Sequence, residues 1–368
     1  MAGYVPIARI PALCYDHAGG LRERNPMKKL FVTGGAGFIG SAFVRIVLAE
    51  MPACSITNFD ALTYAGNLDN LEGLDQRRHR FVRGDITDRH AVLAALEPGT
   101  DAIVNFAAES HVDRSIASAD VFLRTNILGT QVLLDAAREH RVRRFLQVST
   151  DEVMGSLPED DAAFFTEDSP FEPNSPYAAS KASAEHLVRA AQHTFGLDTL
   201  VTRCGNNYGP RQFPEKLIPL LLANAMRDQP IPVYGDGKNV RDWIYVDDHC
   251  RAILNVLQKA KPGSVYNIGA RNERRNIDLV EAVLSALGKP RSLIRYVKDR
   301  PGHDRRYAID PTRIEQDLGW RPRETWQTGL AKTIRWYQDN TAWVERARSG
   351  AYRDYYAQQY GMNAPLAA

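Results

Sequence analysis

Tyr177 and Lys181 are the first pair of side chains whose spacing suggests chemistry. They stand four residues apart in SPYAASKAS, and on a helix this spacing places both side chains on one face. A nearby ammonium favours phenolate over phenol, so we expect Lys181 to lower the pKa of Tyr177 from about 10 and make it a general base near neutral pH. A Tyr-x-x-x-Lys pattern is common by chance, so this interpretation depends on the surrounding motifs.

Asp151 and Glu152 are a second candidate pair, and they directly follow an apolar run in RRFLQVSTDEVMGS. A solvated turn or a helix-capping acid is the ordinary explanation of such carboxylates at a strand end. The alternative is an acid and a base side by side, which requires one carboxyl group to stay protonated. Burial and a neighbouring anion both raise a carboxyl pKa. We therefore expect the two groups to titrate as a coupled pair.

A glycine-rich turn indicates what accompanies these groups. GGAGFIG follows a strand-like run and opens a helix-like run, and Gly34, Gly37 and Gly40 fit G-x-x-G-x-x-G. A tight turn with a bare backbone lets a pyrophosphate approach, and the helix N-terminus presents free N–H groups to its oxygens. A glycine turn without a ligand is the ordinary alternative, since such a motif alone is weak.

Asp60 strengthens the prediction of a dinucleotide site. It ends the next predicted strand, 20 residues after Gly40, where a carboxylate accepts hydrogen bonds from a ribose and repels a 2′-phosphate. DALTYAGN places no arginine beside it, so we expect NAD rather than NADP. Asp85 and Ile86, in GDITD, end a further strand and would reach the adenine, although an ordinary strand-end aspartate explains Asp85 equally well.

The elements that must position these residues predict an α/β fold. From Met27 to Tyr208, continuous apolar runs alternate with amphipathic stretches, which is typical of a Rossmann-type doubly wound parallel sheet covered on both faces. After Tyr208 the chain is rich in loops and short elements, and VYNIG returns one strand to the sheet. We expect an NAD-binding domain with the catalytic residues over 27–208, and a smaller C-terminal substrate-binding subdomain over 209–368. Residues 1–26, interrupted by Pro and Gly, are expected to be a disordered extension.

Composition excludes several classes of function. The 46 basic and 44 acidic residues give a net charge of +2, so there is no electrostatic case for nucleic acid or an anionic membrane. Cys14, Cys54, Cys204 and Cys250 are far apart, without C-x-x-C or metal-ligand spacing. We interpret them as free thiols in a reducing compartment and expect no metal. No run approaches the roughly 20 apolar residues of a membrane helix, and no signal peptide is evident, so we expect a cytoplasmic protein.

The motifs together carry a more specific resemblance. The Tyr-Lys pair resembles the catalytic couple of extended short-chain dehydrogenases/reductases. TGGAGFIGS, LTYAGN, AAESHVDRSI, TNILGT, STDEV, NNYGPRQFPEKLIPL, VRDWIYVDDH and DRPGHDRRYAID are similar, as a set, to the dTDP-glucose 4,6-dehydratase family. The match extends from about Met27 to about Tyr352.

The resemblance implies a redox-neutral dehydration of dTDP-glucose. Tyr177 would be the base for oxidation at sugar carbon 4, with hydride passing to NAD and Thr150 bonding near the carbon 4 oxygen. Glu152 would then remove the carbon 5 proton and Asp151 would protonate the leaving carbon 6 hydroxyl. Hydride would return to carbon 6 and give dTDP-4-dehydro-6-deoxyglucose. Lys181 completes the implied catalytic set.

The resemblance also implies binding residues. Cofactor contacts match Gly34, Gly37, Phe38, Ile39, Gly40, Asp60, Leu62, Thr63, Asp85, Ile86, Ala107, Ala108, Thr125, Tyr177, Lys181 and Asn207. Substrate contacts match Ser110, Thr150, Asn206, Glu215, Lys216, Pro232, Tyr234, Arg241, Asn276, Arg300 and His303. The cationic members suit a diphosphate, although a solvated charge is the ordinary role of a surface Arg or Lys.

Two positions depart from the family pattern. Met154 stands where the family usually has Tyr, and Gly205 stands where Ser is common. Loss of a phenol would remove one hydrogen-bonding group near the acid–base pair, because a Met sulfur is only a weak acceptor. Met can still fill the volume.

Three alternatives stay open at this point. A dehydratase of another nucleotide sugar such as UDP-glucose would share these motifs. A 4-epimerase would share the fold, NAD and the Tyr-Lys pair, but would not need Asp151 and Glu152. A non-catalytic NAD-binding sensor would have no use for a tuned base. The family also implies a homodimer, whose faces TNILGTQVLLDAAREH and SKASAEHLVRAAQHTFG would supply.

Overall fold

The computed structural model of the chain describes residues 27–159 and 162–348. The predicted N-terminal extension, Cys14 and the last residues of the 209–368 segment lie outside the described residues. Within the described part, no helix is both long enough and apolar enough to cross a membrane.

The centre of the fold is a seven-stranded sheet in the order β10-β6-β5-β4-β1-β2-β3. All neighbouring strands pair in parallel. The strands are β1 Lys29–Thr33, β2 Ser55–Asp60, β3 His79–Arg83, β4 Ala102–Asn105, β5 Arg144–Thr150, β6 Thr199–Cys204 and β10 Val265–Ile268. Strand order reverses at β1, between β2 and β4, which is where such sheets bind ligands at the carboxyl ends of their strands.

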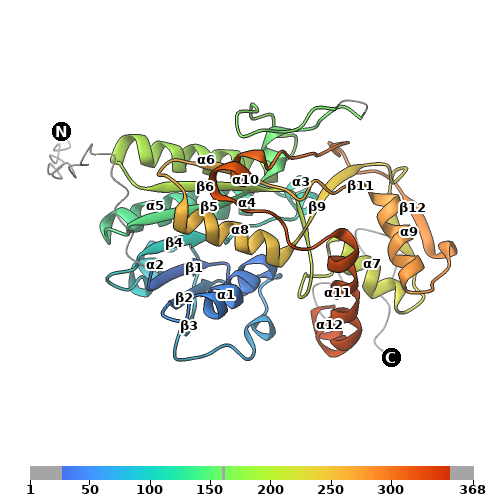
Figure 1. Ribbon diagram of the computed structural model, residues 1–368, viewed down its shortest axis with the longest axis horizontal. Coiled ribbons are helices and arrows are strands. Elements are labelled where there is room, and N and C mark those ends of the chain that lie inside the picture. The colour runs from blue at the N-terminus through green and yellow to red at the C-terminus, as the bar shows by residue number, and fades with distance from the viewer. Residues whose placement is uncertain (1–26, 160–161, 349–368) are drawn as a thin grey trace.

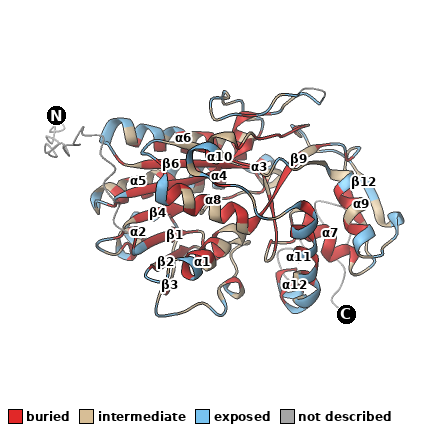
Figure 2. Cartoon of the chain, in the orientation of Figure 1, coloured by how far each residue is buried: buried red, intermediate tan, exposed pale blue. Residues whose placement is uncertain are grey.

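Helices cover both faces of this sheet, as predicted (Figure 1). One face packs on α1 Phe38–Glu50 and α8 Val246–Lys259, with α10 Thr312–Leu318 beside them. The other face packs on α2 Arg89–Ala95, α5 Thr130–Glu139 and α6 Pro176–Phe195. The strands inside the sheet are largely buried on both faces (Figure 2), so their sequences are mainly apolar, whereas the edge strand β3 is partly exposed. The predicted return of VYNIG to the sheet is confirmed, since β10 pairs with β6.

Shorter elements follow strands β2, β4 and β5. They are η1 Leu68–Leu71, α3 Val112–Ala117, α4 Asp120–Phe122, the π-helix η2 Leu123–Gly129 and the single 3₁₀ turn η3 Asp151–Met154. The sequence predicts one continuous helix over the segment that contains α4, η2 and α5. Within the π turn, the side-chain amide of Asn126 donates to the carbonyl of Glu109 and to Ser180 Oγ.

The C-terminal part has a separate hydrophobic core next to the large sheet. One small sheet has the order β11-β9-β7 and another pairs β12 with β8. The strands are β7 Asn206–Tyr208, β8 Ile231–Tyr234, β9 Val240–Tyr245, β11 Glu273–Arg275 and β12 Ile294–Val297. The helices are α7 Leu217–Ala225, α9 Asn276–Ala286, η4 Arg291–Leu293, α11 Trp326–Asp339 and α12 Thr341–Ala347, and Figure 1 shows most of them on the side away from α2 and α5.

Candidate active site

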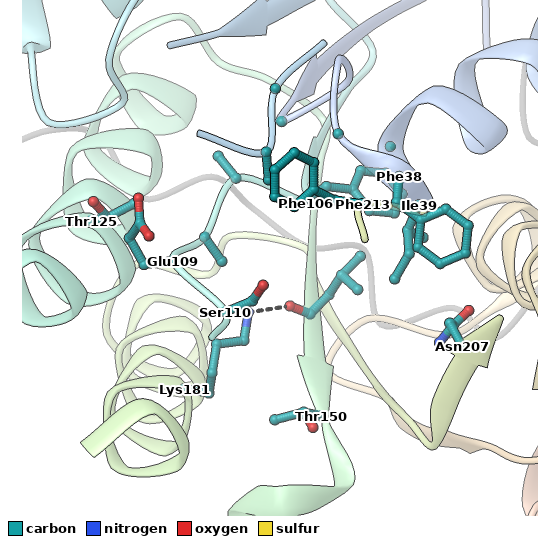
Figure 3. Close-up of a pocket in the computed structure, with 18 of the residues that line it drawn as sticks. Phe38, Ile39, Phe106, Glu109, Ser110, Thr125, Thr150, Lys181, Asn207 and Phe213 are labelled. Carbon is teal, nitrogen blue, oxygen red and sulfur yellow. Dashed lines mark hydrogen bonds between the residues drawn. The ribbon is translucent and has the colours of Figure 1, made fainter. Parts of the chain in front are cut away.

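A cavity of about 340 Å³ lies at the carboxyl ends of the parallel strands. Its floor includes the ends of β2, β5 and β6, and its walls come from the glycine turn, α6 and the segment before α7. Figure 3 shows side chains from these separate elements converging on it, among them Phe38, Thr125, Thr150, Lys181 and Asn207. The cavity therefore lies where the topology predicts a ligand site.

The glycine turn has the shape that a pyrophosphate requires. Gly34 has φ +69°, and a Cβ there would be 2.6 Å from the amide nitrogen of Ala107. A Cβ on Gly40 would be 2.2 Å from the Gly34 carbonyl oxygen, whereas one on Gly37 would meet only that oxygen, at 3.3 Å. Gly37 caps α1 without a side-chain hydrogen bond, so the first N–H groups of the helix remain available. These residues fit a dinucleotide such as NAD.

Asp60 is fixed at the end of β2 by two backbone donors. Its Oδ2 accepts from the amide of Ala36 at 2.9 Å, and its Oδ1 accepts from the amide of Leu62 at 2.7 Å. Burial raises the pKa of this carboxyl, and the two backbone hydrogen bonds oppose that shift. Leu62 itself, predicted to bind the cofactor, is not among the described residues that line the cavity. Its role in the structure is to hold Asp60, which does line the cavity.

The Tyr-Lys pair lies on α6 as predicted, but the expected effect on the Tyr177 pKa is wrong. Both side chains are buried. Lys181 Nζ donates to the Val148 carbonyl at 2.6 Å (Figure 3). Burial, with the anions of Glu152 and Asp151 among the further causes, raises the pKa of Tyr177 well above its usual value, and a hydrogen bond with Thr150 only partly opposes this.

Lys181 is itself altered by burial. Desolvation lowers its pKa to about 8, and the carboxylate of Glu185, one helical turn further along α6, works in the opposite direction. The prediction failed because it counted the ammonium as a neighbour of the phenol and did not count the desolvation that both groups undergo.

Asp151 and Glu152 are not a solvated turn. Asp151 is 2% exposed, and both residues line the cavity from η3. Burial first, and then the charge of Glu152, raises the pKa of Asp151 well above its usual range. Burial also raises the pKa of Glu152, but the cations of Arg300, Lys216 and Arg241 oppose it. The pKa of Asp151 is therefore raised the more strongly of the two, which suits Asp151 as the acid and Glu152 as the base of a catalytic pair.

Thr150 connects the two pairs. Its hydroxyl caps η3 by accepting from the Glu152 amide at 3.3 Å, and it lies 3.3 Å from Asp151 Oδ1. Its hydrogen bond with Tyr177 places the same hydroxyl beside the phenol. A reacting oxygen that contacts Tyr177 would therefore also lie close to the acid–base pair.

The structure brings most predicted site residues together. Those that line the cavity are Gly34, Gly37, Phe38, Ile39, Gly40, Asp60, Thr63, Asp85, Ile86, Ala107, Ala108, Ser110, Thr125, Thr150, Asp151, Glu152, Tyr177, Lys181, Asn206, Asn207, Glu215 and Lys216. The predicted residues that do not line it are Leu62, Pro232, Tyr234, Arg241, Asn276, Arg300 and His303.

Most of the predicted residues that do not line the cavity belong to the C-terminal part of the chain. Tyr234 donates to Asp113 Oδ2 at 3.0 Å, and Arg300 Nη1 lies 3.3 Å from Asp113 Oδ1. His303 packs edge-on against Tyr234, with ring centroids 6.1 Å apart. The charges of Arg241 and Arg300 nevertheless act on Glu152. Pro232 lies within β8, and Asn276 begins α9.

Several cavity residues were missed. Phe106, Glu109, Gln212 and Trp243 line it. Glu109 is a buried carboxyl within AAESHVDRSI, so its place in a recognised motif could have identified it. Gln212 and Trp243 also lie within quoted motifs, NNYGPRQFPEKLIPL and VRDWIYVDDH, whereas Phe106 lies outside all of them.

Met154 lies outside the cavity, so the lack of a phenol at this position removes no hydrogen-bonding group from the cavity wall. It is 2% exposed and belongs to a small apolar cluster with Val153, Phe165, Ala182, Tyr307 and Ile309. Its sulfur is 3.7 Å from Arg203 Nη1. It is not among the described residues that line the cavity, so a phenol here would face Arg203. Gly205 does line the cavity, and a Cβ there would be 2.7 Å from the Asp242 carbonyl oxygen.

Comparison with known proteins supports the same class of site. The family model described as GDP-mannose 4,6 dehydratase matches residues 31–333. A protein of Xanthomonas campestris pv. campestris (strain B100) named dTDP-glucose 4,6-dehydratase is 51% identical over 347 residues, which covers 89% of this chain and 98% of the relative. A Streptomyces niveus protein of the same name is 52% identical, with 87% and 96% covered.

Solved structures agree with these relatives. DesIV, a dTDP-glucose 4,6-dehydratase from Streptomyces venezuelae with NAD and TYD bound, has a TM-score of 0.84 and 52% identity, with 87% of this chain and 99% of that chain covered. The UDP-glucose 4-epimerase of Thermus thermophilus in complex with NAD has a TM-score of 0.78 but 30% identity, with 85% and 99% covered.

The parallel sheet, the glycine turn and the buried Tyr-Lys pair define a Rossmann-type enzyme of the extended short-chain dehydrogenase/reductase class. With about half of its residues identical to each of several relatives over nearly their whole length, the chain belongs to the dTDP-glucose 4,6-dehydratase family.

Proposed function

We propose that this chain converts dTDP-glucose to dTDP-4-dehydro-6-deoxyglucose by an NAD-dependent, redox-neutral dehydration. The observation that supports this most is the Asp151-Glu152 pair, with Asp151 buried and Glu152 partly buried, in the same cavity as Tyr177 and Lys181. Oxidation and return of hydride need only the Tyr-Lys pair, whereas removal of water needs a further base and a further acid. The enzyme is therefore a hydro-lyase.

Each proton has an assigned carrier. Tyr177 takes the proton of the carbon 4 hydroxyl, with Thr150 bonding the same oxygen. NAD, when bound, supplies the acceptor and donor of the hydride and a positive ring charge that favours the Tyr177 phenolate. Glu152 removes the carbon 5 proton that the carbon 4 ketone has made acidic, and Asp151 protonates the carbon 6 oxygen as it leaves as water. Asp151 and Glu152 end this step with their protonation states exchanged. When hydride returns to carbon 6, Glu152 gives its proton back to carbon 5, and the proton that Tyr177 took from the carbon 4 hydroxyl replaces the one that Asp151 lost.

The binding groups have separate tasks in this proposal. Gly34, Gly37 and the start of α1 hold the pyrophosphate of the cofactor, and Asp60 holds its adenosine ribose. On the substrate side, Arg241 and Arg300 hold the diphosphate of the nucleotide and oppose the rise in the Glu152 pKa that burial causes. Residues from about 27 to 208 bind the cofactor, and the later part of the chain supplies the nucleotide-sugar side, apart from segments such as β10 that return to the sheet.

We also propose that the enzyme is a cytoplasmic homodimer. Large apolar side chains are exposed on α3, α4 and η2, namely Ile116 at 41%, Val121 at 43%, Leu123 at 45% and Leu128 at 56%. A patch of this kind, next to α5 and α6, is typical of a protein–protein interface. Within the described part of the chain, Cys54, Cys204 and Cys250 are free and buried thiols, which is ordinary for a reducing compartment.

The discriminating experiment is incubation of the purified protein with dTDP-glucose, UDP-glucose and dTDP-galactose, without added reductant, with products identified by mass and NMR. We expect the 4-dehydro-6-deoxy product from dTDP-glucose. Dehydration of UDP-glucose alone would overturn the choice of substrate. Interconversion of glucose and galactose forms would instead show a 4-epimerase, and lack of reaction with all three would favour an NAD-binding sensor.

A further inference from the structure

The loop over residues 61–67 is held at both ends by the cofactor side of the cavity. At its start, the amide of Leu62 donates to Asp60 Oδ1 at 2.7 Å. At its end, the amide of Asn67 donates to the carbonyl of Ala36, in the glycine turn, at 3.1 Å. Several residues of this loop line the cavity. These two hydrogen bonds, which anchor the loop to the cofactor side of the cavity, therefore fix the direction of its tip.

Tyr64, at the tip of this loop, reaches across to the substrate side. Its hydroxyl donates to Glu215 Oε1 at 3.1 Å, between residues 151 positions apart. The guanidinium of Arg114 stacks on its ring, 3.9 Å from the centroid, and Phe213 packs edge-on with a centroid distance of 5.8 Å. The ring is thus held on two sides, which leaves its hydroxyl directed at Glu215.

Glu215 has one oxygen that makes no hydrogen bond with any residue that the structure describes. The residue is 7% exposed and lines the cavity. Among the described residues, its buried Oε2 has no hydrogen-bond partner. Two side-chain nitrogens, His111 Nε2 and Arg114 Nε, lie at 3.8 and 3.9 Å, beyond a hydrogen bond. A buried acceptor of this kind on a cavity wall is well placed for a ligand hydroxyl.

We propose that Tyr64 is a positioning residue for the substrate site: it fixes the Glu215 carboxylate so that Oε2 faces a hydroxyl of the bound nucleotide sugar. This inference rests on the proposed function, because it takes the ligand of Glu215 to be the nucleotide sugar. It adds that the loop that surrounds the cofactor also sets the geometry of the substrate site. Tyr64 acts through Glu215 and does not itself contact the reacting atoms.

The charged surroundings of Glu215 make this role measurable by pH. Burial raises its pKa to about 7, and Lys216, Arg114 and the hydrogen bond from Tyr64 oppose that shift, while Glu109 adds to it. His111 is held neutral, because burial lowers its pKa well below the usual value. Removing the Tyr64 hydroxyl takes away a donor to the carboxylate, so the Glu215 pKa should rise further. The ionised form is then lost at a higher pH as the solution is acidified.

The test is Tyr64→Phe, with Tyr266→Phe as the matched control. Tyr266 also donates to a carboxylate at 3.1 Å, that of Asp317, but it does not line the cavity. Because a hydrogen bond to a charged group is lost, we expect Tyr64→Phe to raise the KM for dTDP-glucose about tenfold and to move the acidic limb of kcat/KM upward by roughly one pH unit. The kcat at saturation and the NAD content should stay near wild type. The control should leave KM and the pH profile unchanged.

A double-mutant cycle separates positioning from general destabilisation. On a Glu215→Gln background, Tyr64→Phe should have little further effect on KM, because the two changes remove the same interaction. Additive effects, or an unchanged KM and pH profile in Tyr64→Phe, would overturn the proposal. The calorimetric Kd for dTDP-glucose gives a readout that does not depend on turnover. If wild type binds dTDP-glucose without dehydrating it, only the proposed function fails, whereas failure of wild type to bind it would overturn both.

Discussion

At the scale of single residues, the most important feature is the different environment of the Asp151 and Glu152 carboxyl groups. The two carboxyls are adjacent in sequence, and the pKa of each is raised first by burial. The cations of Arg300, Lys216 and Arg241 oppose the rise for Glu152, whereas the charge of Glu152 adds to the rise for Asp151. The neighbours of each acid therefore make the two pKa values unequal, and this is a property of the tertiary structure.

The first prediction concerns Glu152→Gln. The amide keeps the volume but cannot accept the carbon 5 proton, so dehydration should slow by about 10²- to 10⁴-fold. Oxidation at carbon 4 uses Tyr177 and should persist, visible as transient absorbance of reduced cofactor at 340 nm on mixing with dTDP-glucose, roughly as in wild type. Asp151→Asn is the comparison, because it should also retain the oxidation. A Glu152→Gln enzyme that dehydrates at the normal rate would show that Glu152 is not the base.

The second prediction concerns Met154→Tyr, which restores the usual residue of the family. Met154 is packed in a small apolar cluster and does not line the cavity, so the larger ring should overpack the cluster and lower the free energy of unfolding by about 1–3 kcal/mol. Turnover should change less than about twofold. Denaturant unfolding measures the change in free energy, and steady-state rates measure turnover. A large gain in turnover would mean that residue 154 acts on the acid–base pair.

The residues of the catalytic set could be predicted from the sequence, but their ionisation could not. Tyr177, Lys181, Asp151 and Glu152 were found because their types and spacing match a known pattern. The raised pKa of Tyr177 depends on how deeply α6 and β5 bury it. Likewise, Tyr64 lies within the motif LTYAGN, but its contact with Glu215 could not be predicted, since the two residues are 151 positions apart.

At the scale of elements, the turn between β1 and α1 shows how glycine positions support both the fold and the cofactor site. A Cβ at residue 40 would collide with the Gly34 carbonyl, whereas one at residue 37 would project toward the cavity. The two glycines therefore have separable tasks, close packing for Gly40 and ligand access for Gly37.

The third prediction compares Gly40→Ala with Gly37→Ala. Gly40→Ala should lower the free energy of unfolding by about 1–3 kcal/mol through overpacking, and it should also lower the NAD content of the purified protein. Gly37→Ala should cost only about 0.5–1 kcal/mol, as a weaker N-cap, yet lower the NAD content as well. Thermal unfolding and cofactor extraction measure both quantities. Full NAD content in both variants would contradict the assignment of the turn.

Element prediction from sequence worked best where periodicity was strong. The buried strands and amphipathic helices before Tyr208 are recognisable because each is a local pattern. The strands β7, β8, β11 and β12 are three or four residues long, so they carry no such pattern. They depend on partners such as the distant pairing of β8 with β12. The π-helix η2 also escaped prediction, because side-chain periodicity does not report the backbone hydrogen-bond register.

At the scale of the whole molecule, the exposed apolar patch on α3, α4 and η2 leads to the fourth prediction. Wild type should elute with the mass of two chains in light scattering, and Leu123→Asp/Leu128→Asp should dissociate it, because charges replace apolar groups that are 45% and 56% exposed. Tyr296→Asp is the control, since Tyr296 is 59% exposed on β12, away from this patch. A monomeric wild type, or a dimer that survives the double change, would contradict the proposed interface.

The two halves of the molecule meet at the cavity, so the complete reaction is a property of the whole chain. The part of the chain that contains the large sheet supplies the cofactor turn and Tyr177. Arg241 and Arg300, from the C-terminal part, act on Glu152 through their charges. The dehydration is internally redox-neutral only if the hydride that leaves carbon 4 is the one that returns to carbon 6.

The most direct test is therefore the fate of an isotope during one turnover. Purified enzyme is incubated with dTDP-glucose that carries deuterium at carbon 4, and the product is examined by NMR and mass. The assigned mechanism predicts that the product is dTDP-4-dehydro-6-deoxyglucose with the deuterium on carbon 6. Deuterium recovered at carbon 4 of a galactose epimer, or a dehydrated product without deuterium at carbon 6, would contradict it.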